Sequence, residues 1–292
     1  MDWFGGLRNS GRRKPDEHSP LSTFTSVFAA VCSIVTACFF FYLAEGYIKS
    51  SVPVPTGPLE LVDVPDWVGE ELKMRLIASA GGSTFRLDEN AAHLAAENLS
   101  SFSWLANVEV QTRHDRLLVK GTWRRPLGFV KHGLRTFYVD ADMVTLDFVP
   151  MPELAIVKID GLSAAPKTAF GQVWQADDLA AAMTILAKLD QMDVKVTPDK
   201  PLLFEIESID VSNFNGRRSA KLPHIVLYAK DKTQIIWGAE FGAWQQYLEA
   251  PDDEKLAKLY SFYQEYGSLL NGAKFINLRD PQQTVLTPVD KY

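Results

Sequence analysis

The stretch LSTFTSVFAAVCSIVTACFFFYL, residues 21–43, decides how the rest of the chain is organised. No charged residue occurs between His18 and Glu45. As a helix these 23 residues would measure about 34 Å, enough to cross a hydrocarbon core of roughly 30 Å. A cleavable signal peptide is the alternative, but its apolar core of about 7–15 residues ends at small residues. Here the stretch ends in the bulky FFFYL, so we expect a transmembrane helix over 21–44.

The charges on either side of this helix predict its orientation. Arg8, Arg12, Arg13 and Lys14 precede it, whereas only Lys49 follows it closely. Lysine and arginine are retained on the cytoplasmic side of a membrane, so we expect residues 1–20 to be a cytoplasmic tail. The bulk of the chain would then lie outside, after a proline-rich extended linker over 45–58.

The composition limits the class of protein. Among 292 residues, 47% are hydrophobic and 23% are charged, which is typical of a globular chain, and the net charge of −6 argues against nucleic-acid binding. Cys32 and Cys38 are the only cysteines and both lie in the apolar stretch. The extracytoplasmic part therefore has neither a disulfide framework nor a thiolate metal site.

Residues 59–125 predict one small module. Residues 59–64 favour a strand, Asp66 is a helix N-cap, and Gly81-Gly82 would end that helix. Asp88 would cap a second helix with an apolar face of Ala92, Leu94, Ala95 and Leu99. Residues 108–111 and 116–123 then alternate as a hairpin. The predicted order is a strand, two helices and a hairpin.

Residues 126–292 predict a second, larger module. Short strands are expected at 128–130, 136–139, 144–148, 156–159, 202–209, 224–228, 234–237, 275–278 and 284–287. Amphipathic helices are expected over 177–192 and 252–270, and residues 211–221 read as an additional loop. The fold class is therefore α+β, with a mostly antiparallel sheet and inserted helices.

The sequence offers little catalytic chemistry. It contains no phosphate-binding loop, nucleophile elbow or HExxH helix, and its five histidines are far apart. Glu205 and Glu207 would share one face of a strand, where two carboxylates could serve acid–base catalysis, but an exposed strand face is the simpler interpretation. We expect no catalytic residue, metal, cofactor or small-molecule substrate.

Two features indicate binding to proteins. The helix over 252–270 carries Tyr260, Phe262, Tyr263 and Tyr266, which either bridge core and solvent or contact a partner. The final strand is a candidate sheet edge, and an exposed edge accepts a strand from another chain. We therefore expect partner contacts at the following six residues: Thr284, Val285, Leu286, Thr287, Phe275 and Tyr263.

Seven stretches together resemble the bacterial division protein family FtsQ, also called DivIB. In chain order they are GSTFRLD (82–88), WLANVEV (104–110), RRPLG (124–128), FYVD with MV (137–140, 143–144), LAIVKIDG (154–161), KLAKL (255–259) and FINLR (275–279). The order and spacing carry the resemblance. Trp123, Gly128 and Asn277 depart from the family pattern, as expected of a distant member.

The resemblance implies an architecture and a role. Residues 59–125 would form a POTRA domain and 126–292 a β domain whose C-terminal edge receives FtsB- and FtsL-like partners. The protein would then be a non-enzymatic scaffold of the division machinery, located in the inner membrane at the division site. Two alternatives stay open: a membrane-tethered envelope hydrolase that uses Glu205, Glu207 or Asp210, and a POTRA-type secretion or assembly factor.

Overall fold

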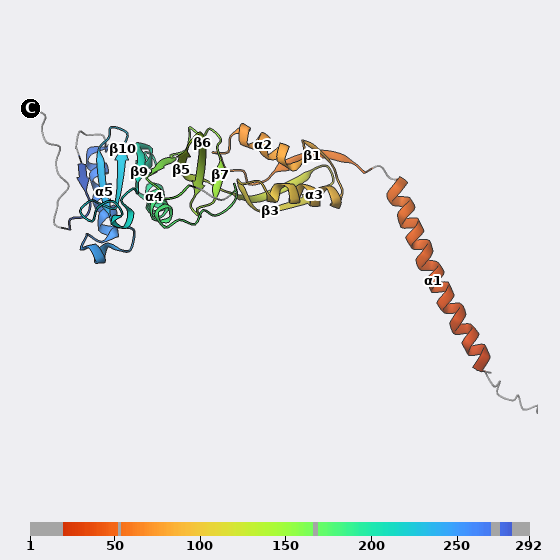
Figure 1. The fold of residues 1–292 in the computed structure, drawn as a ribbon. Coiled ribbons are helices and arrows are strands. Elements are labelled where there is room, and N and C mark those ends of the chain that lie inside the picture. Colours follow the sequence, from red (N-terminus) through yellow and green to blue (C-terminus); the bar gives the residue numbers. More distant parts are fainter. Residues whose placement is uncertain (1–19, 52–53, 166–168, 270–274, 282–292) are drawn as a thin grey trace, which may run out of the picture. The chain divides into compact units, whose positions relative to one another are not determined.

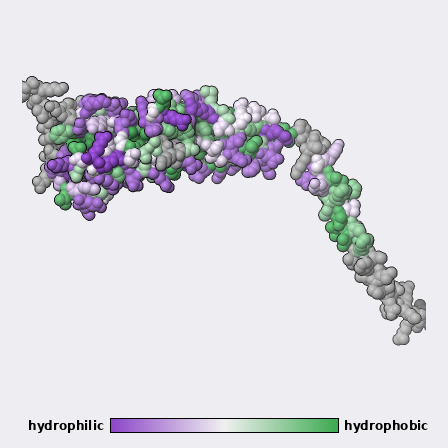
Figure 2. Space-filling model, in the orientation of Figure 1, coloured by the Kyte–Doolittle hydropathy of each residue, from purple (hydrophilic) through white to green (hydrophobic). Residues whose placement is uncertain are grey.

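The computed structural model describes residues 20–51, 54–165, 169–269 and 275–281, and the chain divides into two units between Val54 and Pro55 (Figure 1). The described part of the first unit is one helix, α1 (Pro20–Ser51). Over Phe28–Ile48 this helix is long and apolar enough to span a membrane, and its side chains there are exposed. Figure 2 shows this stretch in the green of hydrophobic residues. The helix predicted over 21–44 is confirmed.

Helix α1 satisfies its own polar side chains and runs further than predicted. The hydroxyls of Ser33 and Thr36 donate to main-chain carbonyls four residues earlier, at 2.9 and 2.8 Å. The helix continues to Ser51, and the next strand already begins at Thr56, so the linker predicted over 45–58 is much shorter. Pro53 is the first proline after the apolar stretch, so no proline ends the helix before Ser51.

The second unit begins with a module of four strands and two helices. Its order of strand, helices and hairpin was predicted correctly, but residues 84–86 form an additional strand between the helices. The sheet order is β2-β1-β4-β3, with β1 parallel to β4 and the other pairs antiparallel. The elements are β1 (Thr56–Leu61), α2 (Glu70–Ala80), β2 (Thr84–Arg86), α3 (Glu89–Ser100), β3 (Leu105–Thr112) and β4 (Leu117–Trp123).

Local chemistry sets the ends of these two helices. The Asp88 carboxylate accepts the Ala91 N–H at 2.8 Å, so the predicted N-cap of α3 is confirmed. Gly81 adopts φ 116° and ends α2, as predicted. Helix α2 begins after Gly69 rather than at Asp66 because the chain first turns through Pro65, whose carbonyl accepts the Val68 N–H.

The larger module contains an eight-stranded sheet in the order β12-β11-β10-β9-β8-β5-β6-β7. It is mixed rather than mostly antiparallel, because β5–β8, β8–β9 and β11–β12 pair in parallel. The strands are β5 (Pro126–His132), β6 (Arg135–Asp140), β7 (Thr145–Asp147), β8 (Val157–Asp160), β9 (Ile206–Asp210), β10 (Ile225–Ala229), β11 (Gln234–Gly238) and β12 (Phe275–Asn277), and the helices are α4 (Asp177–Val196) and α5 (Asp252–Tyr266).

Alternation along these strands builds one core. In register across β8, β9, β10, β11 and β12 lie five buried aliphatic residues: Ile159, Ile209, Leu227, Ile235 and Ile276. They share a single hydrophobic cluster with the apolar sides of α4 and α5. The amphipathic helix predicted over 177–192 is confirmed as α4, on which Leu179, Met183, Leu186 and Leu189 are all buried.

Residues 202–205 differ from the predicted strand. They form a short 3-10 helix, η1 (Leu202–Glu205), and β9 starts only at Ile206. The physical reason is the buried Asp193 carboxylate, which accepts the N–H groups of Leu202 and Leu203, both at 2.9 Å. These donors are therefore unavailable to a sheet ladder.

The two modules share a hydrophobic cluster and a polar junction at Asp147. One oxygen of its carboxylate accepts the hydroxyl of Ser103 at 2.7 Å and the indole N–H of Trp104 at 2.8 Å. The other oxygen lies 3.0 Å from the guanidinium of Arg75. Trp104 is fully buried and packs edge-on against Tyr138. Strand β7, which contains Asp147 and lies at the end of the larger sheet opposite β12, is thereby tied to the smaller module.

Candidate functional site

The strand predicted as the partner-binding edge, residues 284–287, lies outside the described residues, and so do Thr284, Val285, Leu286 and Thr287. The last described strand is β12, which lies at one end of the eight-stranded sheet. It pairs in parallel with β11, and within the described residues no strand pairs with its other side. Phe275 is 43% exposed, Ile276 is buried in the core, and the Leu278 N–H extends the ladder to the Ile236 carbonyl at 3.0 Å.

This arrangement gives β12 the chemistry of an acceptor strand. A strand paired on one side directs alternate N–H and C=O groups to the other side, where an incoming strand can bond them. Because side chains alternate across a sheet, an added strand would present one set toward the core side of Ile276 and the other set beside Phe275. Phe275, one of the six predicted contact residues, is therefore at the surface.

Tyr263, another of the six, lies in the core instead. It is 2% exposed, and its hydroxyl donates to the Lys200 carbonyl at 3.2 Å. Burial raises the pKa of Tyr263 to about 12. Tyr260 and Phe262 are buried as well, and the Tyr260 hydroxyl donates to Asp193 at 2.7 Å. These three side chains therefore lie in the core rather than bridging core and solvent, and Tyr263 offers no surface to a partner.

Helix α5 also carries a buried ion network. The Lys255 side chain is fully buried, and its ammonium group lies 2.7 Å from Glu249 and 3.9 Å from Asp252. It also lies over the Trp237 ring, 5.4 Å from the centroid. Asp252, the first residue of α5, is itself only 5% exposed, and burial raises its pKa.

The network holds the loop of residues 239–251, between β11 and α5. Glu249 also accepts the Ala239 N–H at 2.9 Å, and Asp252 accepts the Gly242 N–H at 2.7 Å. Gly238 has φ 99°, and a Cβ there would collide with the Glu249 carboxylate. Glycine is thus required where the loop leaves β11.

The 239–251 loop displays an apolar turn. It contains the 3-10 helix η3 (Trp244–Tyr247), which ends at Leu248 in the left-handed conformation, φ 55° and ψ 37°. Leu248 is 90% exposed and Tyr247 is 44% exposed. Sequence analysis did not find this turn, because neither the exposure of one leucine nor a positive φ leaves a periodic signal.

The additional loop predicted at 211–221 is closely organised. The buried Asn213 side chain donates to the carbonyls of Ser219, Leu222 and Pro223 at 2.9–3.1 Å. Arg217 reaches the buried Asp178 carboxylate at 2.7 Å, which anchors the loop to the start of α4. The loop contains the short helix η2 (Phe214–Gly216).

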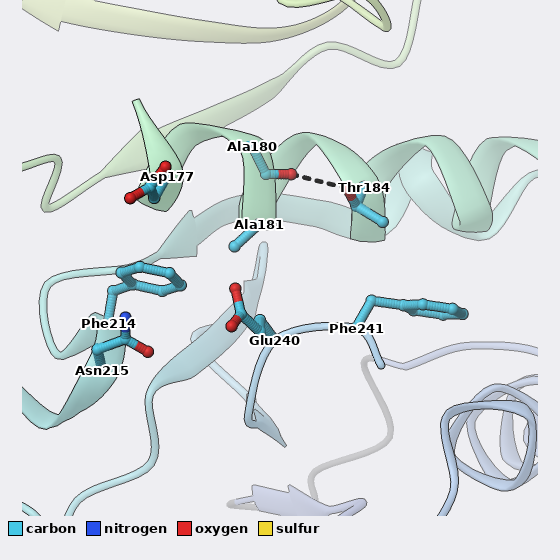
Figure 3. A pocket seen from close by; sticks show the side chains of 8 residues that line it. All are labelled: Asp177, Ala180, Ala181, Thr184, Phe214, Asn215, Glu240 and Phe241. Carbon is cyan, nitrogen blue, oxygen red and sulfur yellow. Dashed lines mark hydrogen bonds between the residues drawn. The ribbon is translucent and has the colours of Figure 1, made fainter. Parts of the chain in front are cut away.

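A small pocket of about 250 Å³ opens where this loop, the 239–251 loop and α4 meet (Figure 3). The small side chains of Ala180 and Ala181 line the pocket on the α4 side, and Glu240 extends toward α4 from the opposite side. Asp177 and Phe241 also line it. This volume is below the roughly 300–1,000 Å³ of ordinary ligand sites, so the pocket accommodates a single side chain better than a cofactor.

Glu205 and Glu207, considered for acid–base chemistry, do not share a strand face. Glu205 is in η1, nearly buried, and its carboxylate accepts the Leu269 N–H at 2.6 Å and the Ser268 hydroxyl at 2.9 Å. Glu207 forms an ion pair with Lys232. In the described part of the chain, no group of three or more histidine, cysteine, aspartate or glutamate residues is placed to hold a metal ion.

Comparison with known proteins adds no identification: no family model matches the chain, and no curated protein matches it.

Proposed function

We propose that the chain is a non-enzymatic scaffold of the bacterial division machinery, of the FtsQ type. In this proposal α1 anchors it in the inner membrane, residues 1–20 are cytoplasmic, and both folded modules are extracytoplasmic. The module of 59–125 acts as a POTRA domain, and the module of 126–292 receives small partners resembling FtsB and FtsL. The protein concentrates at the division site.

The position of β12 carries this proposal. The resemblance implies a partner-binding edge near the C-terminus, and β12 is a sheet-edge strand whose outer side pairs with no strand in the described structure. Edge pairing supplies main-chain hydrogen bonds and requires no catalytic residue. A further support is the membrane-spanning length of α1, which suits a protein that works at the membrane surface.

The first test is localisation combined with depletion. A fluorescent fusion at the N-terminus should concentrate at mid-cell, and depletion should produce filamentous cells. Uniform fluorescence around the envelope together with normal septation would overturn the proposal, and defects in outer-membrane protein assembly under depletion would favour the secretion or assembly factor. Loss of hydrolysis of a wall polymer after Glu207→Gln would favour the hydrolase.

The second test addresses β12 itself. A photo-crosslinking amino acid placed at Phe275 in the full-length protein should capture the host's FtsB- or FtsL-like protein. The matched control is Leu134, fully exposed in the turn between β5 and β6, where we expect no adduct. Equal capture from both positions, or none from position 275, would refute strand addition at this edge.

A further inference from the structure

The pocket between α4, the 211–221 loop and the 239–251 loop contains polar side chains that no other group of this chain engages. Glu240 extends into it toward Ala181 (Figure 3), and its carboxylate forms no hydrogen bond or ion pair with a described residue. The same holds for the side chains of Asp177 and Asn215, which also line the pocket. Two carboxylates and one amide therefore offer oxygen acceptors to a ligand.

An aromatic ring forms part of the wall beside these acceptors. The ring of Phe214, which is 7% exposed, extends into the space in front of α4 (Figure 3). A guanidinium group suits such surroundings, because its flat face stacks on an aromatic ring while its N–H groups donate to a carboxylate in the same plane. An ammonium group has no flat face and gains less from this geometry.

The cations near the pocket do not occupy it. Arg217 pairs with the buried Asp178 at 2.7 Å, and its other nitrogens donate to main-chain carbonyls. Lys188, one turn of α4 beyond Thr184, lies over the Phe241 ring at 5.7 Å from the centroid. Neither is among the residues that line the pocket, and no other lysine or arginine of the described chain lines it.

The remaining charges leave the pocket moderately negative. Asp177 lies in the first turn of α4, where it offsets the positive end of the helix dipole. His224 interacts electrostatically with Glu240, but burial lowers the pKa of His224 below 6.5, so it is neutral at pH 7. Glu240 is then opposed mainly by Lys188, which lies outside the lining. One cation that enters the pocket would meet Glu240 directly and Lys188 only at a distance.

The size of the pocket indicates what carries this cation. About 250 Å³ is less than an ordinary small-molecule site, which encloses most of its ligand. A single side chain fits, while the chain to which it is attached stays outside. Arginine is among the residues that most often fill a pocket at the centre of a protein interface.

We infer that this pocket receives the side chain of one arginine of a protein partner, with its guanidinium group on the Glu240 carboxylate and against the Phe214 ring. Asp177 and Asn215 supply further oxygen acceptors. The inference goes beyond the proposed function and does not depend on it, because it requires neither β12 nor a division protein.

The experiment uses the full-length protein in nanodiscs and saturation-transfer NMR, which observes the ligand. The probe is arginine with an acetylated amino group and an amidated carboxyl group, so that it resembles an arginine within a polypeptide. We expect a dissociation constant on the order of 1 mM for so small a ligand. The corresponding blocked citrulline has nearly the same shape without the charge and should bind at least about tenfold more weakly.

Variants of the lining assign the binding to this pocket. Glu240→Gln keeps the size of the side chain and should raise the dissociation constant at least about fivefold. Asp177→Asn should raise it about twofold, because Asp177 is exposed. Lys188→Met should lower it about twofold, because it removes the opposing charge. Glu89→Gln, an exposed carboxylate in the first turn of α3, is the matched control and should bind as the wild type does.

These changes should leave the fold intact, with a Tm within about 2 °C of the wild type, since neither Asp177 nor Glu240 has a partner among the described residues. The inference is overturned if the wild type shows no saturation transfer to the blocked arginine, if the blocked citrulline binds equally well, or if Glu240→Gln binds within twofold of the wild type.

A second measurement tests that the arginine belongs to a protein. A photo-crosslinking amino acid at Thr184, which is exposed beside the pocket, should capture in cells a peptide that contains an arginine, and Glu240→Gln should reduce this capture. An adduct without arginine, or one unaffected by Glu240→Gln, would overturn the inference. So would free arginine that binds at least about tenfold more tightly than the blocked form, because the pocket would then be a site for the free amino acid.

Discussion

Lys255→Met tests whether the buried ion network is needed for stability. Methionine keeps the length of the aliphatic stem and its contact with Trp237, but it removes the ammonium group. The carboxylates of Glu249 and Asp252, 10% and 6% exposed, would then face each other's charge without compensation. Each still accepts one main-chain N–H, from Ala239 and Gly242, which is insufficient for a buried carboxylate.

The expected cost follows from this geometry. Removing one partner of a buried pair destabilises by about 3–5 kcal/mol, because the desolvation of the other partner is no longer offset. The Lys255–Glu249 contact of 2.7 Å and the full burial of Lys255 support that range rather than the value for an exposed pair. With about 2–4 °C per kcal/mol for a domain of this size, the Tm should fall by about 6–20 °C.

Urea unfolding followed by tryptophan fluorescence measures this change, since Trp237 lies beside the ammonium group. Lys73→Met is the matched control: Lys73 pairs with Glu70 at the same 2.7 Å, but the pair is on the surface of α2. Its loss should cost less than about 1 kcal/mol. The double variant Lys255→Met/Glu249→Gln should recover part of the loss, because it removes the unpaired charge.

A cost below about 1 kcal/mol for Lys255→Met, equal to that of the control, would refute the reasoning, because an exposed pair costs that little. So would a double variant whose loss equals the sum of the two single losses. Either result would mean that Glu249 and Asp252 have access to water and that the 239–251 loop is held by other contacts.

Three further predictions concern other buried polar groups. Asp147→Ala leaves the indole N–H of Trp104 without its acceptor and should cost about 1–3 kcal/mol in urea unfolding. Burial raises the pKa of Asp178, but hydrogen bonds from Arg217 and the Ser163 N–H outweigh burial and lower the pKa below 3.8. The ionised Asp178 therefore stabilises the folded state above pH 3.8, and this contribution is lost as the pH falls through the folded-state pKa. Asp178→Asn should therefore flatten the acid side of a plot of Tm against pH. Burial lowers the pKa of His224 below 6.5, so stability should rise as the pH rises toward 6.5, and His224→Phe should abolish that rise in the same measurement.

Local sequence signals predicted most of the elements. Asp88 capped α3 and Gly81 ended α2 because these devices act within one helical turn. Alternation located β8, β10, β11 and β12 because burial on one face repeats every two residues. Leu94 was assigned to the apolar face of α3 but is 58% exposed, because periodicity shows which residues share a face and not how far a neighbour covers it.

Long-range contacts decided the remainder. Residues 202–205 became η1 because Asp193, far away in the sequence, takes two of their N–H groups. Parallel pairing of β12 with β11 could not be read from either strand, since parallel and antiparallel partners use the same residue types. Tyr263 was expected at the surface, but a tyrosine that bridges core and solvent and one that is buried with a bonded hydroxyl have the same sequence signature.

The sequence by itself determined the apolar helix, the α+β class and the presence of a strand at 275–277, because each depends on chemistry within a few neighbouring residues. Tertiary structure alone decided that β12 lies at the end of the sheet with no strand on its outer side among the described residues, that Lys255 is buried among carboxylates and that Leu248 is held exposed in the 239–251 loop. These three properties depend on which segments meet in space. A residue's exposure and partners are set by chain that is distant in sequence, and no local pattern records them.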